Sequence, residues 1–237
     1  MVKYIFFDLG LTLVENHMAE HYQKALAASD ICLTKERAEQ IYHLANKYFM
    51  RERQGSLGKG DRNVFEEYVS YICELAGDAS KKDQTIEAMQ KMEKPQWKAF
   101  SYTHEVLDAL KEQGFKMGLI SNWDDSCRNV LRDNGLETYL EPIIISSEIG
   151  IEKPDKRIFE KALAEAGVKA EECLYVGDNY YDDAVGAAKL GISSFIINPA
   201  DYFGIEELRD KKVNIISDIR EIPCKIREIQ KTDKSIV

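Results

Sequence analysis

Short apolar segments alternate with segments of helical periodicity through the second half of the chain, and this alternation restricts the fold more than any other feature. The apolar segments are bounded by turn residues and are too short to be anything but the strands of βαβ units. We expect strands at residues 116–120, 142–145, 173–176 and 194–197, and helices at residues 105–113, 125–133, 155–166 and 183–190. Strands linked by helices in this way form a mostly parallel sheet with helices on both faces. The sequence therefore predicts an α/β fold built on a doubly wound, Rossmann-like parallel sheet.

The N-terminal segment predicts another strand of this sheet, followed by a large helical insertion. Residues 2–7 are apolar apart from Lys3, which is typical of a strand buried on both faces. From about residue 17 to residue 96, apolar residues recur at helical spacing and glycines separate the segments, which indicates about four helices. We therefore expect a core domain of residues 1–14 and 101–237, and an inserted all-helical domain of residues 15–100. The tail after residue 201 is expected to add a helix and an edge strand near residues 213–216.

Polar residues follow several of the predicted strands directly. In an open parallel sheet, ligands bind outside the carboxyl ends of the strands, so residues at these positions are candidates for a functional site. A lysine that precedes a proline at the start of a predicted helix can reach the same edge. The candidates are Asp8, Gly10, Ser121, Asn122, Lys153 and Asp178.

These residue types suit the chemistry of phosphoryl groups. Two strand-end carboxylates, with a third from Asp182 or Asp183, suit Mg²⁺, which prefers a few carboxylates together with water and substrate phosphate. The hydroxyl of Ser121 and the ammonium of Lys153 could hold the oxygens of a phosphoryl group. Phosphoryl transfer depends mainly on positioning and on charge neutralisation. The sequence therefore favours a site for phosphoryl transfer at this edge of the sheet.

Four segments in this order resemble the motifs of the haloacid dehalogenase-like (HAD) superfamily. Residues 8–12, DLGLT, are similar to its first motif, D-x-D-x-T, and the pair Ser121-Asn122 is similar to its second. Lys153-Pro154 is similar to the third motif, and residues 177–183 to the fourth, in which a second Asp lies four or five positions after the first. The residues that follow favour Asp183 over Asp182 for that position. Each motif is weak alone, but four in order, from residue 4 to about residue 197, are specific.

The resemblance implies catalytic roles for Asp8, Ser121 and Lys153. Asp8 would attack phosphorus and form an aspartyl-phosphate, which is covalent catalysis by a carboxylate. Ser121, Asn122 and Lys153 are expected to bind the substrate at its transferring group. The inserted helical domain would then correspond to the cap domain of one HAD subfamily.

The resemblance also implies a Mg²⁺ cofactor. Asp8, the backbone carbonyl of Gly10 and Asp178 are expected to be its ligands, with Asp183 acting through a metal-bound water. The physiological substrate and the choice between Asp182 and Asp183 stay open at this point.

Gly10 departs from the pattern of the superfamily's phosphatases, which usually carry a second Asp there as general acid and then base. Such acid–base help is worth roughly 10²–10⁴-fold in rate. The retained acidic fourth motif favours a Mg²⁺-dependent phosphatase acting on a small phosphorylated metabolite. Because the superfamily's dehalogenases also lack this Asp, a 2-haloacid dehalogenase is an alternative, and a non-catalytic binding or regulatory protein is another.

Composition and charge limit the partners and the location. The net charge of −9 argues against a surface that binds nucleic acid or anionic membrane. No apolar run approaches the roughly 20 residues that a membrane-spanning helix needs. Five scattered cysteines without a C-x-x-C pair, and a strand that begins at once and leaves no signal peptide, predict a cytoplasmic protein. We expect a monomer or homodimer that binds a small phosphorylated molecule, and a solvated basic cluster at Arg51, Arg53, Lys59 and Arg62.

Overall fold

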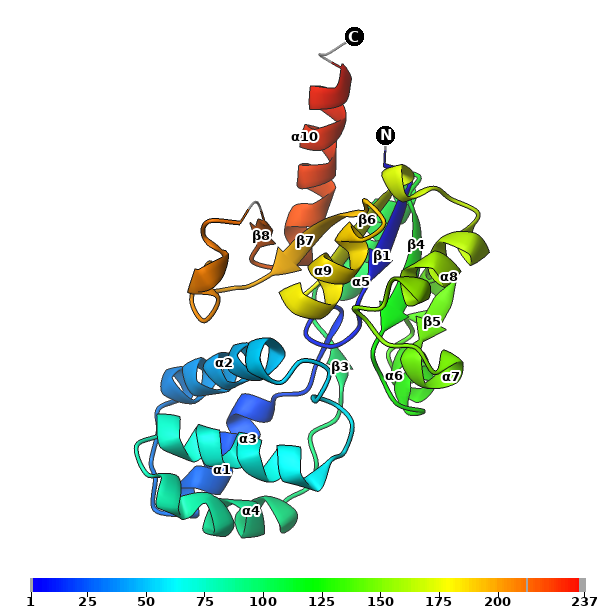
Figure 1. Ribbon diagram of the computed structural model, residues 1–237. Helices are drawn as coiled ribbons and strands as arrows, with labels where there is room; N and C mark the ends of the chain where they lie inside the picture. The colour runs from blue at the N-terminus through cyan, green and yellow to red at the C-terminus, as the bar shows by residue number, and fades with distance from the viewer. Residues whose placement is uncertain (1, 212, 235–237) are drawn as a thin grey trace. The chain divides into compact units, whose positions relative to one another are not determined.

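Six parallel strands form the central sheet, in the order β5-β4-β1-β6-β7-β8 (Figure 1). All four residues of β1 are buried, which explains why this strand is apolar without alternation. In the register, Phe7 of β1 lies beside Leu119 of β4 on one side and Val176 of β6 on the other. The strands are β1 Tyr4–Phe7, β4 Lys116–Ser121, β5 Ile143–Ile145, β6 Cys173–Gly177, β7 Ser193–Ile197 and β8 Asn214–Ile216. The predicted doubly wound parallel sheet is confirmed.

Helices cover both faces of this sheet. On one face, Phe159 of α8 (Lys156–Ala166) and Ala187 of α9 (Val185–Ala188) belong to the same apolar cluster as Phe6 and Tyr175 of the strands. On the other face, α5 (Thr103–Glu112) contacts β4 and α10 (Ile222–Lys234). The expected tail elements are therefore the edge strand β8 and the helix α10. The shorter elements of this unit are α6 Cys127–Asp133, α7 Ser146–Ile149 and the 3-10 turns Glu137–Tyr139, Ala170–Glu172, Glu206–Leu208 and Ile219–Glu221.

The helix expected at residues 183–190 is confirmed only over Val185–Ala188. A π-helical turn, η4 (Tyr180–Ala184), precedes the short helix α9. The Asn179 side chain accepts hydrogen bonds from the backbone N–H groups of Tyr181 and Asp182 and so begins the turn. The wider turn lets Asp183 point inward, where its carboxylate is fully buried. π-Helical turns are often found at functional sites.

Four helices make up the insertion, as expected: α1 Met18–Ala27, α2 Lys35–Glu52, α3 Arg62–Leu75 and α4 Lys82–Gln90, with a 3-10 turn at Ala79–Lys81. Thr34 and Asp61 cap the N-termini of α2 and α3 through their side-chain oxygens. The helices pack around one apolar cluster that includes Phe49, Val69 and Ile72. This insertion has a hydrophobic core of its own.

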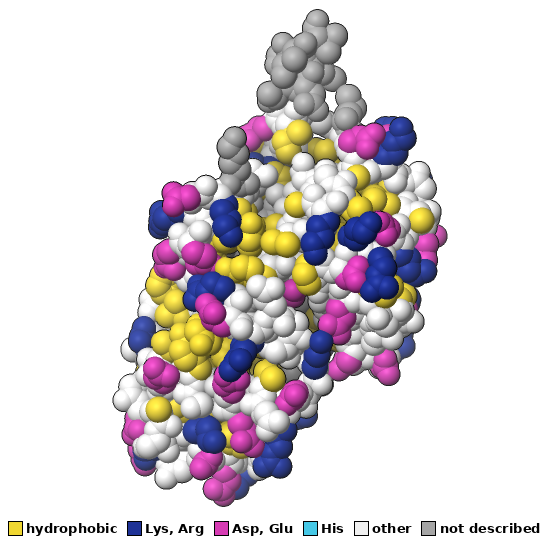
Figure 2. All heavy atoms as spheres, in the orientation of Figure 1, with side chains coloured by type: hydrophobic (Ala, Val, Ile, Leu, Met, Phe, Trp, Pro, Cys, Tyr) yellow, Lys and Arg dark blue, Asp and Glu magenta, His cyan; other side chains and the backbone are white. Residues whose placement is uncertain are grey.

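The basic cluster of the insertion lies among acidic residues. Arg53 pairs with Glu67, and Arg62 pairs with Glu66 one helical turn away. Figure 2 shows basic and acidic side chains interspersed over the visible face. Exposed pairs of this kind contribute little energy, and they fit the expectation of a solvated charged surface.

The computed structural model describes residues 2–211 and 213–234. By its contacts the chain divides into two units, Asn16–Trp97 and the remainder of the chain. The segments that lead into and out of the insertion pair as two antiparallel strands, β2 (Val14–Glu15) and β3 (Lys98–Ala99). Among the described residues, no helix is both long enough and apolar enough to cross a membrane.

Candidate active site

The candidate residues gather where the winding of the sheet reverses. Along the chain, β1, β4 and β5 extend the sheet in one direction, and β6, β7 and β8 extend it in the other. The strands β1 and β6 are therefore neighbours at the reversal. Asp8 follows β1, and its backbone N–H donates to the carbonyl of Val176 in β6 at 2.8 Å. Asp178 follows β6, and both carboxylates are buried. This reversal is the usual ligand-binding position of doubly wound sheets.

Lys153 connects most of the predicted site residues. Its Nζ donates to Oδ1 of Asp8 at 2.8 Å and to Oδ1 of Asp183 at 2.6 Å. The Ser121 hydroxyl donates to the same Oδ1 of Asp8 at 2.9 Å. Both bonds to Asp8 therefore go to one oxygen, and no described residue donates a hydrogen bond to the other, Oδ2. The bonded pairs are 30 to 145 positions apart in the sequence. The structure thus brings together Asp8, Ser121, Lys153 and Asp183.

Asp183 is held by close packing as well as by hydrogen bonds. Its Oδ2 accepts the backbone N–H of Asn179 at 3.0 Å. A Cβ atom on Gly177 would lie 2.1 Å from the same oxygen, so only glycine leaves room for this carboxylate. Because both oxygens of Asp183 have protein partners, its first role in this structure is to hold Lys153.

The sequence predicts no role for Tyr175 and only substrate binding for Asn122. The Tyr175 hydroxyl accepts from Nζ of Lys153 at 2.9 Å and lies 2.8 Å from the carbonyl of Ile120. The Asn122 side chain, for which substrate binding stays a prediction, bonds the backbone of Lys153 on both sides, donating to its carbonyl at 2.9 Å and accepting its N–H at 2.8 Å. The only sequence signal for Tyr175 was a phenol within a buried apolar strand, where such a group needs a partner.

The electrostatics of the site favour a protonated lysine. Burial lowers the pKa of Lys153, but the neighbouring carboxylates of Asp183 and Asp8 outweigh it and hold this pKa well above its usual value. Burial raises the pKa of the Tyr175 phenol far above its usual range, so this group stays neutral. Burial also raises the pKa of Asp183, against the opposing effect of Lys153.

The first motif has a strained backbone. Leu11 lies at a φ of 52°, in the left-handed region that glycine favours, whereas Gly10 has no positive φ. A non-glycine residue in this conformation costs about 1–2 kcal/mol. The backbone conformation at position 10 therefore does not require glycine. Thr12 of the same motif is buried with no hydrogen-bond partner for its hydroxyl.

Among the candidate carboxylates, Asp182 has a buried oxygen without a hydrogen-bond partner. Its Oδ2 accepts from the Asn179 side chain at 2.7 Å, but its buried Oδ1 has no hydrogen-bond partner. Burial, and then repulsion by Asp183, raise the pKa of Asp182 to about 7. An orphaned carboxylate oxygen of this kind is a donor that a hard cation could use.

The donor set suits Mg²⁺ chemically, although it does not enclose a cation. Four carboxylates and one lysine are buried at these strand ends, an excess of negative charge that a dication would reduce; the carboxylates are those of Asp8, Asp178, Asp182 and Asp183. Within the part of the chain that the structure describes, no three acidic, histidine or cysteine side chains converge to hold a metal. Mg²⁺ usually keeps several waters and takes only one or two protein carboxylates, so an incomplete cage is consistent with it.

We expect the metal-free protein to lose stability as the pH rises, because of Asp182. A carboxyl group with a raised pKa binds its proton more tightly in the folded protein than in the unfolded one. Its contribution to the free energy of unfolding is therefore fully present below about pH 4 and is lost as the pH rises through about 7. A shift of this size corresponds to at most about 4 kcal/mol, and we expect about 1–3 kcal/mol after relaxation. Asp182→Asn should therefore be more stable than the wild type at pH 8 and similar to it at pH 5. Urea unfolding in EDTA measures both differences, and equal differences at the two pH values would contradict the assignment.

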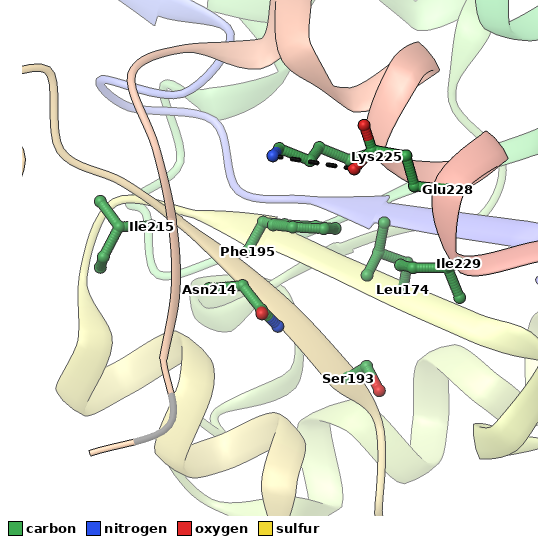
Figure 3. Close-up of a pocket in the computed structure, with 8 residues that line it drawn as sticks. All are labelled: Leu174, Ser193, Phe195, Asn214, Ile215, Lys225, Glu228 and Ile229. Carbon is green, nitrogen blue, oxygen red and sulfur yellow. Dashed lines mark ion pairs between the residues drawn. The ribbon is translucent and has the colours of Figure 1, made fainter. Parts of the chain in front are cut away.

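A separate cavity of about 420 Å³ lies at the face of the sheet that α10 covers (Figure 3). Leu174, Phe195 and Ile229 supply apolar surface, and Lys225 and Glu228 of α10 form an ion pair beside it at 3.9 Å. It contains none of the candidate site residues. We therefore assign it no part in the chemistry.

The architecture defines a class of protein: a doubly wound parallel sheet with a helical insertion after its first strand. A family model described as haloacid dehalogenase-like hydrolase matches residues 5–197. The chain belongs to the haloacid dehalogenase-like hydrolases.

Curated relatives match over part of their length. The haloacid dehalogenase-like hydrolase domain-containing protein 3 of Danio rerio is 32% identical over 132 residues, which are 55% of this chain and 54% of that protein. The glyceraldehyde 3-phosphate phosphatase of Methanothermobacter thermautotrophicus is 34% identical over 105 residues, 42% of this chain and 44% of that protein. The chain thus spans about half the length of these relatives.

Solved structures share the fold over nearly the whole chain. A 2-haloacid dehalogenase from Pseudomonas syringae is 22% identical with a TM-score of 0.55, covering 96% of this chain and 99% of that one. A Bacillus subtilis protein assigned to the HAD hydrolases, crystallised with magnesium, is 19% identical with a TM-score of 0.56, covering 93% and 96%. At these identities the likeness establishes the fold and leaves the reaction open.

Proposed function

We propose that the protein is a Mg²⁺-dependent phosphatase that hydrolyses a small phosphorylated metabolite through an aspartyl-phosphate at Asp8. The observation that carries this proposal is the arrangement around that carboxylate. Ser121 and Lys153 both donate to Oδ1 of Asp8, which leaves Oδ2 able to attack. Family membership and the phosphatase among the relatives support the same reaction class.

The proposed reaction has two steps. Oδ2 of Asp8 forms a bond to phosphorus while the bond from phosphorus to the substrate's ester oxygen breaks, and the leaving alkoxide takes up a proton from water. Water then attacks the aspartyl-phosphate and releases inorganic phosphate and the free carboxylate of Asp8. Ser121 and Lys153 would hold the oxygens of the transferring group beside Asp8, and Lys153 would partly neutralise its charge.

Mg²⁺ is part of the proposal because of the charge in the site. The residues that would hold it are Asp8, the backbone carbonyl of Gly10 and Asp178, with Asp182 or Asp183 beyond them. When bound, it would neutralise the carboxylates and the substrate phosphate. Asp183 was the favoured second acid of the fourth motif, but its two oxygens already bind Lys153 and the Asn179 N–H. Asp182, with its unpartnered Oδ1, is the better placed of the two to approach a metal-bound water.

We assign the helical insertion, residues 15–100, to a cap domain that selects substrates. Its separate hydrophobic core supports a domain that folds as its own unit. A cytoplasmic monomer or homodimer is the form in which we expect the enzyme to act.

A screen of phosphomonoesters for phosphate release tests the proposal. Glyceraldehyde 3-phosphate belongs in the panel because it is the substrate named for a relative. Release that depends on Mg²⁺ and is absent in EDTA supports the proposal. The absence of release from every ester would favour the alternative of a non-catalytic binding protein.

Gly10 favours one second candidate, a 2-haloacid dehalogenase, because the phosphatases' usual acid is missing. In that reaction Asp8 would displace halide from carbon, and no alkoxide would need a proton. Chloride release from a 2-haloacid without metal, measured beside the phosphatase screen, separates the two candidates.

We expect the wild-type phosphatase to depend strongly on the acidity of the leaving group. An aryl phosphate leaves as a stable anion, whereas a sugar phosphate leaves as an alkoxide that needs a proton. Without a carboxyl group at position 10, kcat/KM for the two esters should differ by up to roughly 10²–10⁴-fold. Gly10→Asp should narrow this gap, since the backbone at position 10 accepts a side chain without left-handed strain.

Gly10→Asn is the matched control, because it adds nearly the same volume without an acid. It should leave the gap unchanged. Equal wild-type rates for the two esters, at fixed Mg²⁺, would show that another residue already donates the proton.

A further inference from the structure

We infer that Tyr175 and Asn122 are positioning residues that fix Lys153 from its two ends. This inference rests on the proposed function for its catalytic consequence but on geometry alone for the positioning. A lysine side chain has four rotatable bonds, so a defined ammonium position requires constraints on both the backbone and the head group. The structure supplies both constraints through residues that need not contact the substrate.

Asn122 fixes the backbone end. Its amide donates to the Lys153 carbonyl and accepts the Lys153 N–H, so both polar ends of one side chain are used on one residue. Asn122 directly follows Ser121, which bonds Asp8. The segment that carries the lysine is thereby tied to the end of β4.

Tyr175 fixes the ammonium end. An ammonium has three N–H groups, and those of Lys153 go to Asp8, Asp183 and the Tyr175 hydroxyl. The phenol has a single proton of its own, which the carbonyl of Ile120 accepts at 2.8 Å. Asp183 lies farther from this hydroxyl, at 3.1 Å. Tyr175 therefore acts as a neutral acceptor that directs the third N–H away from the reacting groups.

The consequence is that Lys153 has one orientation before substrate arrives. Its side chain is only 3% exposed, so water does not compete for the ammonium. With Phe at position 175, the third N–H would lose its acceptor in a buried place, and the ammonium could rotate or draw in water. Misplacement of a charged group by about 1 Å can cost roughly 100-fold in rate.

The test compares Tyr175→Phe with Tyr4→Phe. Tyr4 is another buried tyrosine in the same apolar cluster, and its hydroxyl donates to the carbonyl of Met117 at 3.4 Å. The first readout is the proton exchange of the Lys153 ammonium in ¹⁵N-resolved NMR, assigned through Lys153→Arg, at fixed pH without substrate. We expect exchange to become at least about tenfold faster in Tyr175→Phe and to stay as in wild type in Tyr4→Phe.

The second readout is kcat/KM for the best phosphomonoester, which should fall roughly 10- to 100-fold in Tyr175→Phe only. Asn122→Asp should lower it similarly, because a carboxylate oxygen would face the Lys153 carbonyl. Asn134→Asp is its control, since Asn134 also accepts one backbone N–H and donates to one carbonyl, those of Ala99 and Val130.

The outcomes separate the two ideas. If Tyr175→Phe behaves as Tyr4→Phe in both readouts, the inference is overturned. If exchange changes as expected while the wild type hydrolyses no ester, the positioning stands and the proposed function fails.

Discussion

Asp8→Asn is expected to abolish turnover while the fold stays intact. Asparagine keeps the shape of the side chain, and its amide oxygen can still accept from Ser121 and Lys153. It cannot serve as an anionic nucleophile or as a charged metal ligand. We expect kcat/KM to fall at least about 10³-fold, which corresponds to about 4 kcal/mol of transition-state stabilisation. Phosphate release measures the loss, and thermal unfolding should show no fall in Tm, because the variant removes one of several buried like charges.

Asp125→Asn is a suitable control for this variant. Asp125 is an exposed aspartate in the segment that follows β4, and its replacement should leave both activity and Tm unchanged. Substantial phosphatase activity in Asp8→Asn, with deamidation excluded by mass spectrometry, would rule out the covalent mechanism.

Gly177→Ala should damage both stability and activity. The added methyl group would lie 2.1 Å from Oδ2 of Asp183, a carboxylate that Lys153 and the Asn179 N–H hold in place. Overpacking of this kind costs about 1–3 kcal/mol, and we expect the upper end because the obstacle is fixed. Displacement of Asp183 would also release Lys153, so kcat/KM should fall roughly 100-fold. Urea unfolding and phosphate release measure the two effects.

A double-mutant cycle identifies the cause. If the clash with Asp183 is responsible, Gly177→Ala should cost less than about 1 kcal/mol in an Asp183→Ala background. A full cost in that background would mean that glycine is required at position 177 for another reason, such as the twist of β6.

The elements of the fold could be predicted because their signals are local. The buried run before Asp8 predicted β1, and helical spacing with separating glycines predicted the insertion. At α8, Asp155 accepts the backbone N–H of Arg157 at the N-terminus, and Gly167 ends the helix in the left-handed conformation. Parallel strands place their carboxyl ends at one edge, so the sequence alone also predicted that Asp8, Ser121, Lys153 and the fourth motif would lie together.

What the tertiary structure decided is which polar groups meet at that edge. The sequence favoured Asp183 over Asp182 without deciding between them, predicted that Asn122 binds the substrate and gave no role to Tyr175. The π-helical turn directs Asp183 to Lys153 and leaves Oδ1 of Asp182 without a partner. Whether two groups at a strand end form a hydrogen bond depends on differences of a few tenths of an ångström in their distance. The segments that carry such groups are as many as 145 residues apart in the sequence. Propensity and periodicity act over a few residues, so they cannot determine these partners, whereas sheet register and close packing at Gly177 do.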